Sequence, residues 1–105
     1  MLRFRPYRFT LRYLPIAQDD LVSIFDFIAQ DSSNRAISFV EKLDEKIGLL
    51  EHHPLLGRIP RHSKLREYGY RVLIVESYLV FYIVRGQEIE IHRVVHGSRS
   101  LDHLI

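Results

Sequence analysis

The residues from Tyr78 to Val84 form the longest apolar run in the chain, and a pair of turn-like residues borders the run at each end. A strand that is apolar on both faces is typical of the centre of a sheet. Glu76-Ser77 and Gly86-Gln87 leave room only for two-residue turns, so the neighbouring strands at 70–75 and 88–95 should run antiparallel to it. The last third of the chain is therefore predicted to form a three-stranded antiparallel meander. The run is far too short for a membrane helix, which needs about 20 residues.

The first half of the chain combines one alternating segment with two amphipathic helices. Apolar and polar residues alternate over Tyr7–Tyr13, which is typical of a half-buried strand. Pro15 suits the first turn of a helix that continues to about Gln30. A break at 31–34, rich in capping residues, precedes a second helix that ends at His53, because a residue before proline disfavours helical backbone. The apolar stripes consist of Leu21, Ile24, Phe25 and Ile28 in the first helix and Phe39, Val40, Leu43, Ile47 and Leu50 in the second.

These elements predict an α+β fold: an N-terminal strand, a helical hairpin, the meander in one small sheet, and a short C-terminal helix that Ser98 could cap. The hairpin should cover one face of the sheet. The other face is expected to be open, at least near the connection from Leu55 to Tyr68, which shows no clear period and could hold one extended piece. The length of 105 residues suits one domain. We expect an N-terminal arm at 1–6 and a single domain at 7–105.

Charge is unevenly distributed along the chain, although the net charge is only +2. Residues 17–53 carry eight acids and three bases, or −5, whereas residues 58–71 carry five bases and one acid, or +4. This asymmetry predicts one acidic and one basic face. The chain contains no cysteine, which excludes disulfides and thiolate zinc sites and fits a cytoplasmic protein. The N-terminus has no long apolar segment behind its charges, so a signal peptide is not expected.

Several kinds of site are disfavoured. His92 and His96 are four residues apart, but on a strand this spacing separates them by about 13 Å, so they are not a metal pair. No serine has a Gly-x-Ser-x-Gly setting, and no glycine-rich phosphate loop is present. We therefore expect no metal and no cofactor.

The chemistry that the sequence leaves open is acid–base and electrostatic chemistry on a polyanion. A histidine can move a proton near neutral pH, and arginine or lysine can stabilise charge on a phosphate. His96 at a strand end, Arg71 at a strand start and Lys64 before it could cleave RNA through the ribose 2′-hydroxyl. The alternative for His96 is a turn histidine hydrogen-bonded to backbone. Arg99, close to Gly97, is expected to be exposed and available to a partner.

Arg93 has a different expected role. It falls on the same side of its strand as Ile89 and Ile91, so it should point toward the helices. We favour a structural salt bridge from Arg93 to a helix acid such as Asp26 over a catalytic role.

The chain resembles the RelE/ParE superfamily of toxins from type II toxin–antitoxin modules, from Tyr7 onward. The segments that carry the resemblance are Pro15–Ala29, His53-Pro54-Leu55-Leu56-Gly57-Arg58, Tyr78–Tyr82 and His92–Arg99. The resemblance implies a toxin that a small cognate antitoxin neutralises, as in plasmid stabilisation modules. RelE-like members cleave mRNA in the ribosomal A site, and ParE-like members poison DNA gyrase.

The resemblance also suggests roles for single residues. Arg71 matches a phosphate-contacting arginine of RelE, Lys64 a catalytic lysine, and His96 the general base of some ribonuclease members. However, His62 replaces a second RelE lysine, and no tyrosine follows Arg99. These departures count against ribonuclease activity, and the first-helix and Gly-Arg motifs favour a ParE-like gyrase poison. The alternatives are a metal-free ribosome-dependent endoribonuclease and a non-toxic homologue that only binds antitoxin. Residues expected to contact the target, gyrase or ribosome and mRNA, are Arg58, Arg61, His62, Arg66 and Arg99.

Overall fold

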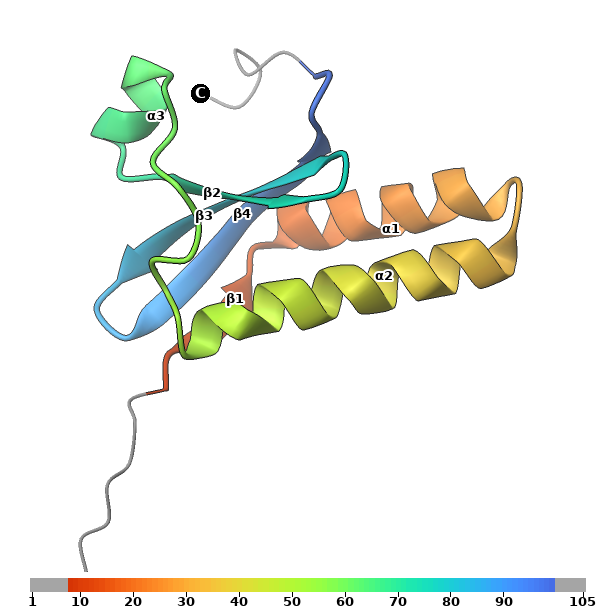
Figure 1. Cartoon of the computed structure of the whole chain (residues 1–105), viewed down its shortest axis with the longest axis horizontal. Helices are drawn as coiled ribbons and strands as arrows, with labels where there is room; N and C mark the ends of the chain where they lie inside the picture. The colour runs from red at the N-terminus through yellow and green to blue at the C-terminus, as the bar shows by residue number, and fades with distance from the viewer. Residues whose placement is uncertain (1–7, 100–105) are drawn as a thin grey trace, which may run out of the picture.

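The computed structural model describes residues 8–99. Its elements are β1 (Thr10–Tyr13), α1 (Pro15–Ala29), α2 (Ser33–Gly48), the short 3-10 turn η1 (Leu49–Glu51), α3 (Ser63–Glu67), β2 (Arg71–Val75), β3 (Tyr78–Arg85) and β4 (Glu88–His96) (Figure 1). The expected arm at 1–6 and most of the expected C-terminal helix lie outside the described residues. No helix within the described range is long and apolar enough to cross a membrane.

The four strands form one sheet in the order β1-β4-β3-β2. β3 pairs antiparallel with β2 and with β4, so the predicted meander is confirmed. β1 completes the sheet by pairing parallel with β4, from Thr10 opposite Glu88 to Tyr13 opposite Ile91. It is shorter than predicted, because it begins at Thr10. The turn after β2 places Glu76 at a φ of 54°, a left-handed conformation that glycine or asparagine would adopt more readily.

The predicted helical hairpin is confirmed and lies on one face of the sheet (Figure 1). Pro15 occupies the first turn of α1, and the Ser32 hydroxyl accepts a hydrogen bond from the Arg35 N–H at the start of α2. The stripe residues Leu43 and Ile47 are fully buried. They join one core cluster with residues of α1, η1 and the sheet: Ala17, Ile24, Leu50, Leu73, Val75, Val80, Tyr82, Ile89, Ile91 and Val94.

The expectation that the second face of the sheet is open is wrong near the connection. α3 lies on that face (Figure 1), and Leu65 from α3 packs with Val72, Phe81 and Val95 in a second cluster. Five residues are too few to show a helical period, which is why the sequence did not predict α3. The extended piece that we expected in this connection is Arg58, which forms an isolated bridge with Val72 through two backbone hydrogen bonds of 2.9 Å.

A β-bulge interrupts β4. Phe81 lies opposite Arg93, whereas the next residue, Tyr82, lies opposite Ile91, so His92 has no cross-strand partner. The alternation of faces therefore shifts after the bulge, and Val94 rather than Arg93 joins the core beneath the hairpin.

Arg93 forms the expected structural salt bridge, but its partner is Asp20 and not Asp26. Its guanidinium donates to both carboxylate oxygens of Asp20 at 2.8 and 3.0 Å, and the Val94 N–H donates to the same carboxylate at 2.9 Å. Beyond Tyr13, β1 no longer pairs with β4, and Asp20 from α1 takes over that edge. Alternation along β4 indicated the direction of Arg93 but not which acid of α1 lies opposite it, because that depends on how α1 packs against the sheet.

Candidate binding surfaces

The segment that resembles the superfamily's Pro-x-x-Gly-Arg motif is fastened to the sheet by Tyr82. The buried Tyr82 hydroxyl donates to the carbonyl of Pro54 at 2.7 Å and accepts from the N–H of Gly57 at 2.8 Å. A Cβ at position 57 would lie 2.7 Å from the Tyr82 ring, so only glycine fits. Arg71 adds a hydrogen bond of 2.8 Å to the Gly57 carbonyl. These contacts hold the start of the segment 58–62, which we call the basic loop, against the sheet.

The loop and the sheet enclose a groove of about 590 Å³, which we call the basic groove. Its lining consists of Arg58, Ile59, Pro60, Arg61 and His62 from the loop and Val72, Leu79 and Phe81 from the sheet. Three of the five predicted target-binding residues thus come together. An apolar floor with a cationic wall suits an acidic surface or a polyanion.

The other two predicted contact residues lie apart from this lining. Arg66 on α3 donates to the carbonyl of Pro60 at 3.4 Å and to the carbonyl of Arg61, so it supports the loop's conformation. Arg99 is exposed in the turn after β4, where its N–H donates to the carbonyl of His96 at 3.0 Å.

The structure does not gather the three residues that a ribonuclease would use. Arg71 pairs with Tyr82 and His96 pairs with Tyr78, so the two lie four positions apart along β3, or about 13 Å. Lys64 is exposed on α3. His96 accepts a hydrogen bond from the N–H of Ser98 at 3.1 Å through its Nδ1 atom, as in the turn-histidine alternative. A catalytic role for the three residues stays a prediction.

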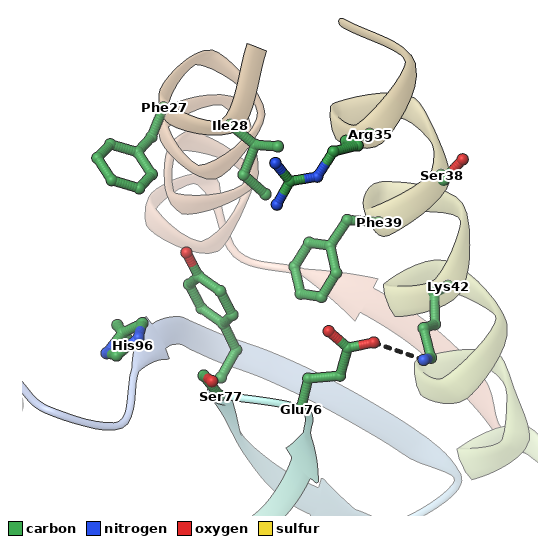
Figure 2. Close-up of a pocket in the computed structure, with 10 residues that line it drawn as sticks. Phe27, Ile28, Arg35, Ser38, Phe39, Lys42, Glu76, Ser77 and His96 are labelled. Atoms are coloured by element: carbon green, nitrogen blue, oxygen red, sulfur yellow. Dashed lines mark hydrogen bonds and ion pairs between the residues drawn. The ribbon is translucent and has the colours of Figure 1, made fainter. Parts of the chain in front are cut away.

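A second groove, of about 480 Å³, lies between the tip of the helical hairpin and the β2–β3 turn (Figure 2). We call it the hairpin groove. Tyr78 makes ring contacts with Phe39 and with His96, each at 5.2 Å between centroids. The Arg35 guanidinium lies between Ile28 and Phe39 in Figure 2. The remaining lining residues are Phe27, whose exposed fraction is 67%, Ser38, Ser77, and the ion-paired Lys42 and Glu76.

The sequence does not predict the hairpin groove, because its walls come from α1, α2, the β2–β3 turn and the ends of β3 and β4. The one available signal was Phe27, an aromatic residue outside the apolar stripe of its helix. A large apolar side chain with that exposure frequently marks a contact surface when others surround it.

Two arginines and a histidine surround the carboxylate of Glu90, and we call these four residues the Glu90 cluster. The exposed fraction of Glu90 is only 8%, and it accepts hydrogen bonds from Arg12 at 3.0 Å and Arg85 at 2.9 Å, with His92 Nε2 at 3.1 Å. The hydrogen bonds from Arg85 and His92 lower the pKa of Glu90 to about 2. The hydroxyl of Tyr70 lies 2.8 Å from His92 Nδ1. The cluster ties β4 to β1 and to the end of β3.

Within residues 8–99, no group of three or more His, Cys, Asp or Glu side chains could hold a metal ion. The candidate site consists of two grooves, the basic groove and the hairpin groove.

Comparison with solved structures places this arrangement among known folds. The chromosomal ParDE toxin–antitoxin system from P. aeruginosa contains a chain that superposes with a TM-score of 0.71 at 23% identity, and the match covers 86% of this chain and 97% of that one. A chain of the RelBE2 toxin–antitoxin complex from Mycobacterium tuberculosis superposes with a TM-score of 0.59 at 22% identity, covering 85% and 98%. The fold is that of the RelE/ParE superfamily of toxins.

The sequence defines the family more closely. Residues 11–101 match the family described as ParE toxin of type II toxin-antitoxin system, parDE, and the chain belongs to this family. No curated protein sequence matches the chain significantly.

Proposed function

We propose that this protein is a growth-inhibiting toxin that acts in the cytoplasm by poisoning DNA gyrase and is neutralised by a small cognate antitoxin. The observation that carries the proposal is the ParE family match over residues 11–101. The separation of Arg71 from His96 along β3 also favours binding over RNA cleavage. Both solved relatives are parts of toxin–antitoxin systems, which supports an antitoxin partner and a hetero-oligomeric complex.

The basic groove is the proposed contact surface for the target. Arg58 and Arg61 are exposed at its rim, and neither side chain makes an ion pair with a described residue. Long-range attraction to an acidic partner should therefore be available at this surface. Gyrase and its bound DNA offer acidic groups to such a groove.

The hairpin groove is the proposed contact surface for the antitoxin. Its aromatic walls suit apolar side chains, and the guanidinium of Arg35 suits a carboxylate between them (Figure 2). An antitoxin segment that carries an acid between apolar residues fits this chemistry.

Induced expression without antitoxin tests the gyrase proposal. We expect DNA breaks and filamentous cells with intact mRNA, and we expect the double variant Arg58→Glu with Arg61→Glu to abolish the DNA breaks. Lys46→Glu is the matched control, because it reverses an exposed charge on α2 away from both grooves. Intact DNA in cells that express the folded wild-type protein would overturn the proposal.

A ribosome-dependent endoribonuclease is the alternative, and the basic character of the face that carries Lys64 favours it. In that case Arg71→Ala or His96→Ala should remove mRNA cleavage while the protein remains folded. Cleavage retained in both variants would exclude these residues as its catalysts. Harmless expression of the folded protein would instead favour a homologue that only binds antitoxin.

A further inference from the structure

Arg71 points away from the basic groove, although it is the neighbour of Val72, which lines the groove. Successive residues of a strand point to opposite faces of a sheet, and cross-strand partners share a face. Val72 and its partner Phe81 belong to the cluster beneath α3. Arg71 instead lies opposite Tyr82, which belongs to the core beneath the hairpin. The side chain of Arg71 therefore starts on the hairpin face, and it is not part of the groove lining.

The segment that leads into the basic groove passes from the hairpin face to the other face of the sheet. Gly57 bonds to the Tyr82 hydroxyl on the hairpin face. Arg58 pairs with the backbone of Val72 at the outer edge of β2. Residues 59–62 then line the groove on the far side, where the chain continues into α3 (Figure 1). The backbone thus crosses the sheet edge at Arg58.

The crossing depends on how Gly57 is held. This residue is buried, and its N–H and its carbonyl both bond to side chains rather than to backbone. The N–H donates to the Tyr82 hydroxyl at 2.8 Å, and the carbonyl accepts from Arg71 Nη1 at 2.8 Å. The same Nη1 lies 3.5 Å from the carbonyl oxygen of Leu55. Because a buried carbonyl without a donor is costly, the Gly57 peptide should keep this position only while Arg71 holds it.

The charge of Arg71 is directed at this turn and not at an acidic side chain. Within residues 8–99, no carboxylate forms an ion pair with it. Burial raises the pKa of the Tyr82 hydroxyl, whereas the Gly57 N–H and the positive charge of Arg71 act in the opposite direction. Arg71, Tyr82 and Gly57 therefore act on one another as one unit, next to the residue at which the chain crosses the edge.

We propose that Arg71 is a positioning residue of the basic groove. By holding the Gly57 carbonyl, it fixes the place where Arg58 crosses the edge of β2, and so it directs the side chains of Arg58 and Arg61 toward the groove. Target binding then depends on Arg71 although Arg71 does not touch the target. The statement about the target rests on the proposed function, whereas the positioning is a property of the isolated chain.

Backbone order parameters from NMR relaxation of the full chain test the positioning. The Arg58 N–H donates to the Val72 carbonyl at 2.9 Å, so its order parameter in the wild type should be about 0.85, the value of a rigid backbone. Arg71→Met keeps most of the side-chain length but cannot donate, and in this variant the value should fall below about 0.6. A role in overall stability alone would leave the order parameter of the folded variant unchanged.

Arg12→Ala is the matched control, because it removes an arginine from the opposite edge strand and should leave the Arg58 value unchanged. A wild-type order parameter at Arg58 in the folded Arg71→Met variant would overturn the proposal. A value below about 0.6 in the wild type itself would also overturn it, and that measurement needs no variant.

The affinity for purified gyrase distinguishes positioning from direct contact. Arg71→Met is compared in the wild type and in the double variant Arg58→Ala with Arg61→Ala. Acting through these two arginines, it should weaken binding about tenfold in the wild type but less than about twofold in the double variant. Equal losses in both backgrounds would overturn the proposal, because Arg71 would then contact the target itself. If the wild type does not bind gyrase, the proposed function fails, and the Arg58 order parameter still decides the positioning.

Discussion

Replacing Tyr82 by phenylalanine should destabilise the protein although it leaves the packing of the core intact. The ring of Tyr82 is fully buried, and the substitution removes only its hydroxyl. That hydroxyl bridges Pro54 and Gly57, the two ends of the turn that leads into the basic groove. Phenylalanine fills the same space, so no large cavity forms and the effect should report the two hydrogen bonds alone.

The magnitude follows from what becomes of each partner. Gly57 is buried, so its N–H would lose its only described acceptor and remain without water, whereas the carbonyl of the half-buried Pro54 can be hydrated. A buried donor without a partner costs about 1–3 kcal/mol, and we expect a loss of about 2 kcal/mol in the free energy of unfolding. In a domain of this size the melting temperature should fall by about 10 °C.

Urea unfolding followed by far-ultraviolet circular dichroism measures this loss. Tyr68→Phe is the matched control, because Tyr68 is 59% exposed and its hydroxyl can bond to water; its unfolding midpoint should stay at the wild-type value. A Tyr82→Phe protein within about 0.5 kcal/mol of the wild type would refute the reasoning, because the hydroxyl would then contribute nothing beyond its exchange with water.

Three further variants test other parts of the structure. Asp20→Ala leaves the mostly buried guanidinium of Arg93 without its carboxylate and should lower the free energy of unfolding in urea by about 3 kcal/mol; a loss below about 1 kcal/mol would contradict this. Gly57→Ala forces a Cβ to within 2.7 Å of Tyr82 and should cost about 1–3 kcal/mol, visible as a lower melting temperature, whereas wild-type melting would refute the close approach. Glu90 has a folded-state pKa of about 2 against an ordinary 4.5, so its contribution to stability is present above pH 4.5 and lost as the pH falls toward 2. Urea midpoints measured from pH 6 to 2 should fall less steeply in Glu90→Gln, and equal slopes would contradict that contribution.

Much of the fold followed from local sequence patterns. The two helices, both two-residue turns and the central position of β3 were predicted, because amphipathic periods and apolar runs act over neighbouring residues. α3 was missed because five residues show no period. The bulge at His92 was missed, although the sequence gives a sign of it: Arg93 stands where the alternation calls for an apolar residue, and Val94 and Val95 follow as two apolar residues in a row.

The candidate site was predictable only as a set of charged residues. The basic segment correctly indicated Arg58, Arg61 and His62 as neighbours in one groove. Sequence could not separate these from Arg66, which supports the same loop by bonding to its carbonyl groups. An arginine that lines the groove and an arginine that supports the loop look alike in the sequence, and only the direction of the side chain in the structure distinguishes the two.

The carboxylate of Asp20 has a consequence for how these molecules behave toward one another. β1 has four residues and β4 has nine, so part of β4 lacks a neighbouring strand on that side. An unpaired strand edge is a template for pairing with another chain, and an inward-facing charge is one means of preventing it. The Asp20 carboxylate accepts the hydrogen bond of the Val94 N–H at this edge, so it reduces the opportunity for intermolecular sheet growth that the short β1 would otherwise leave.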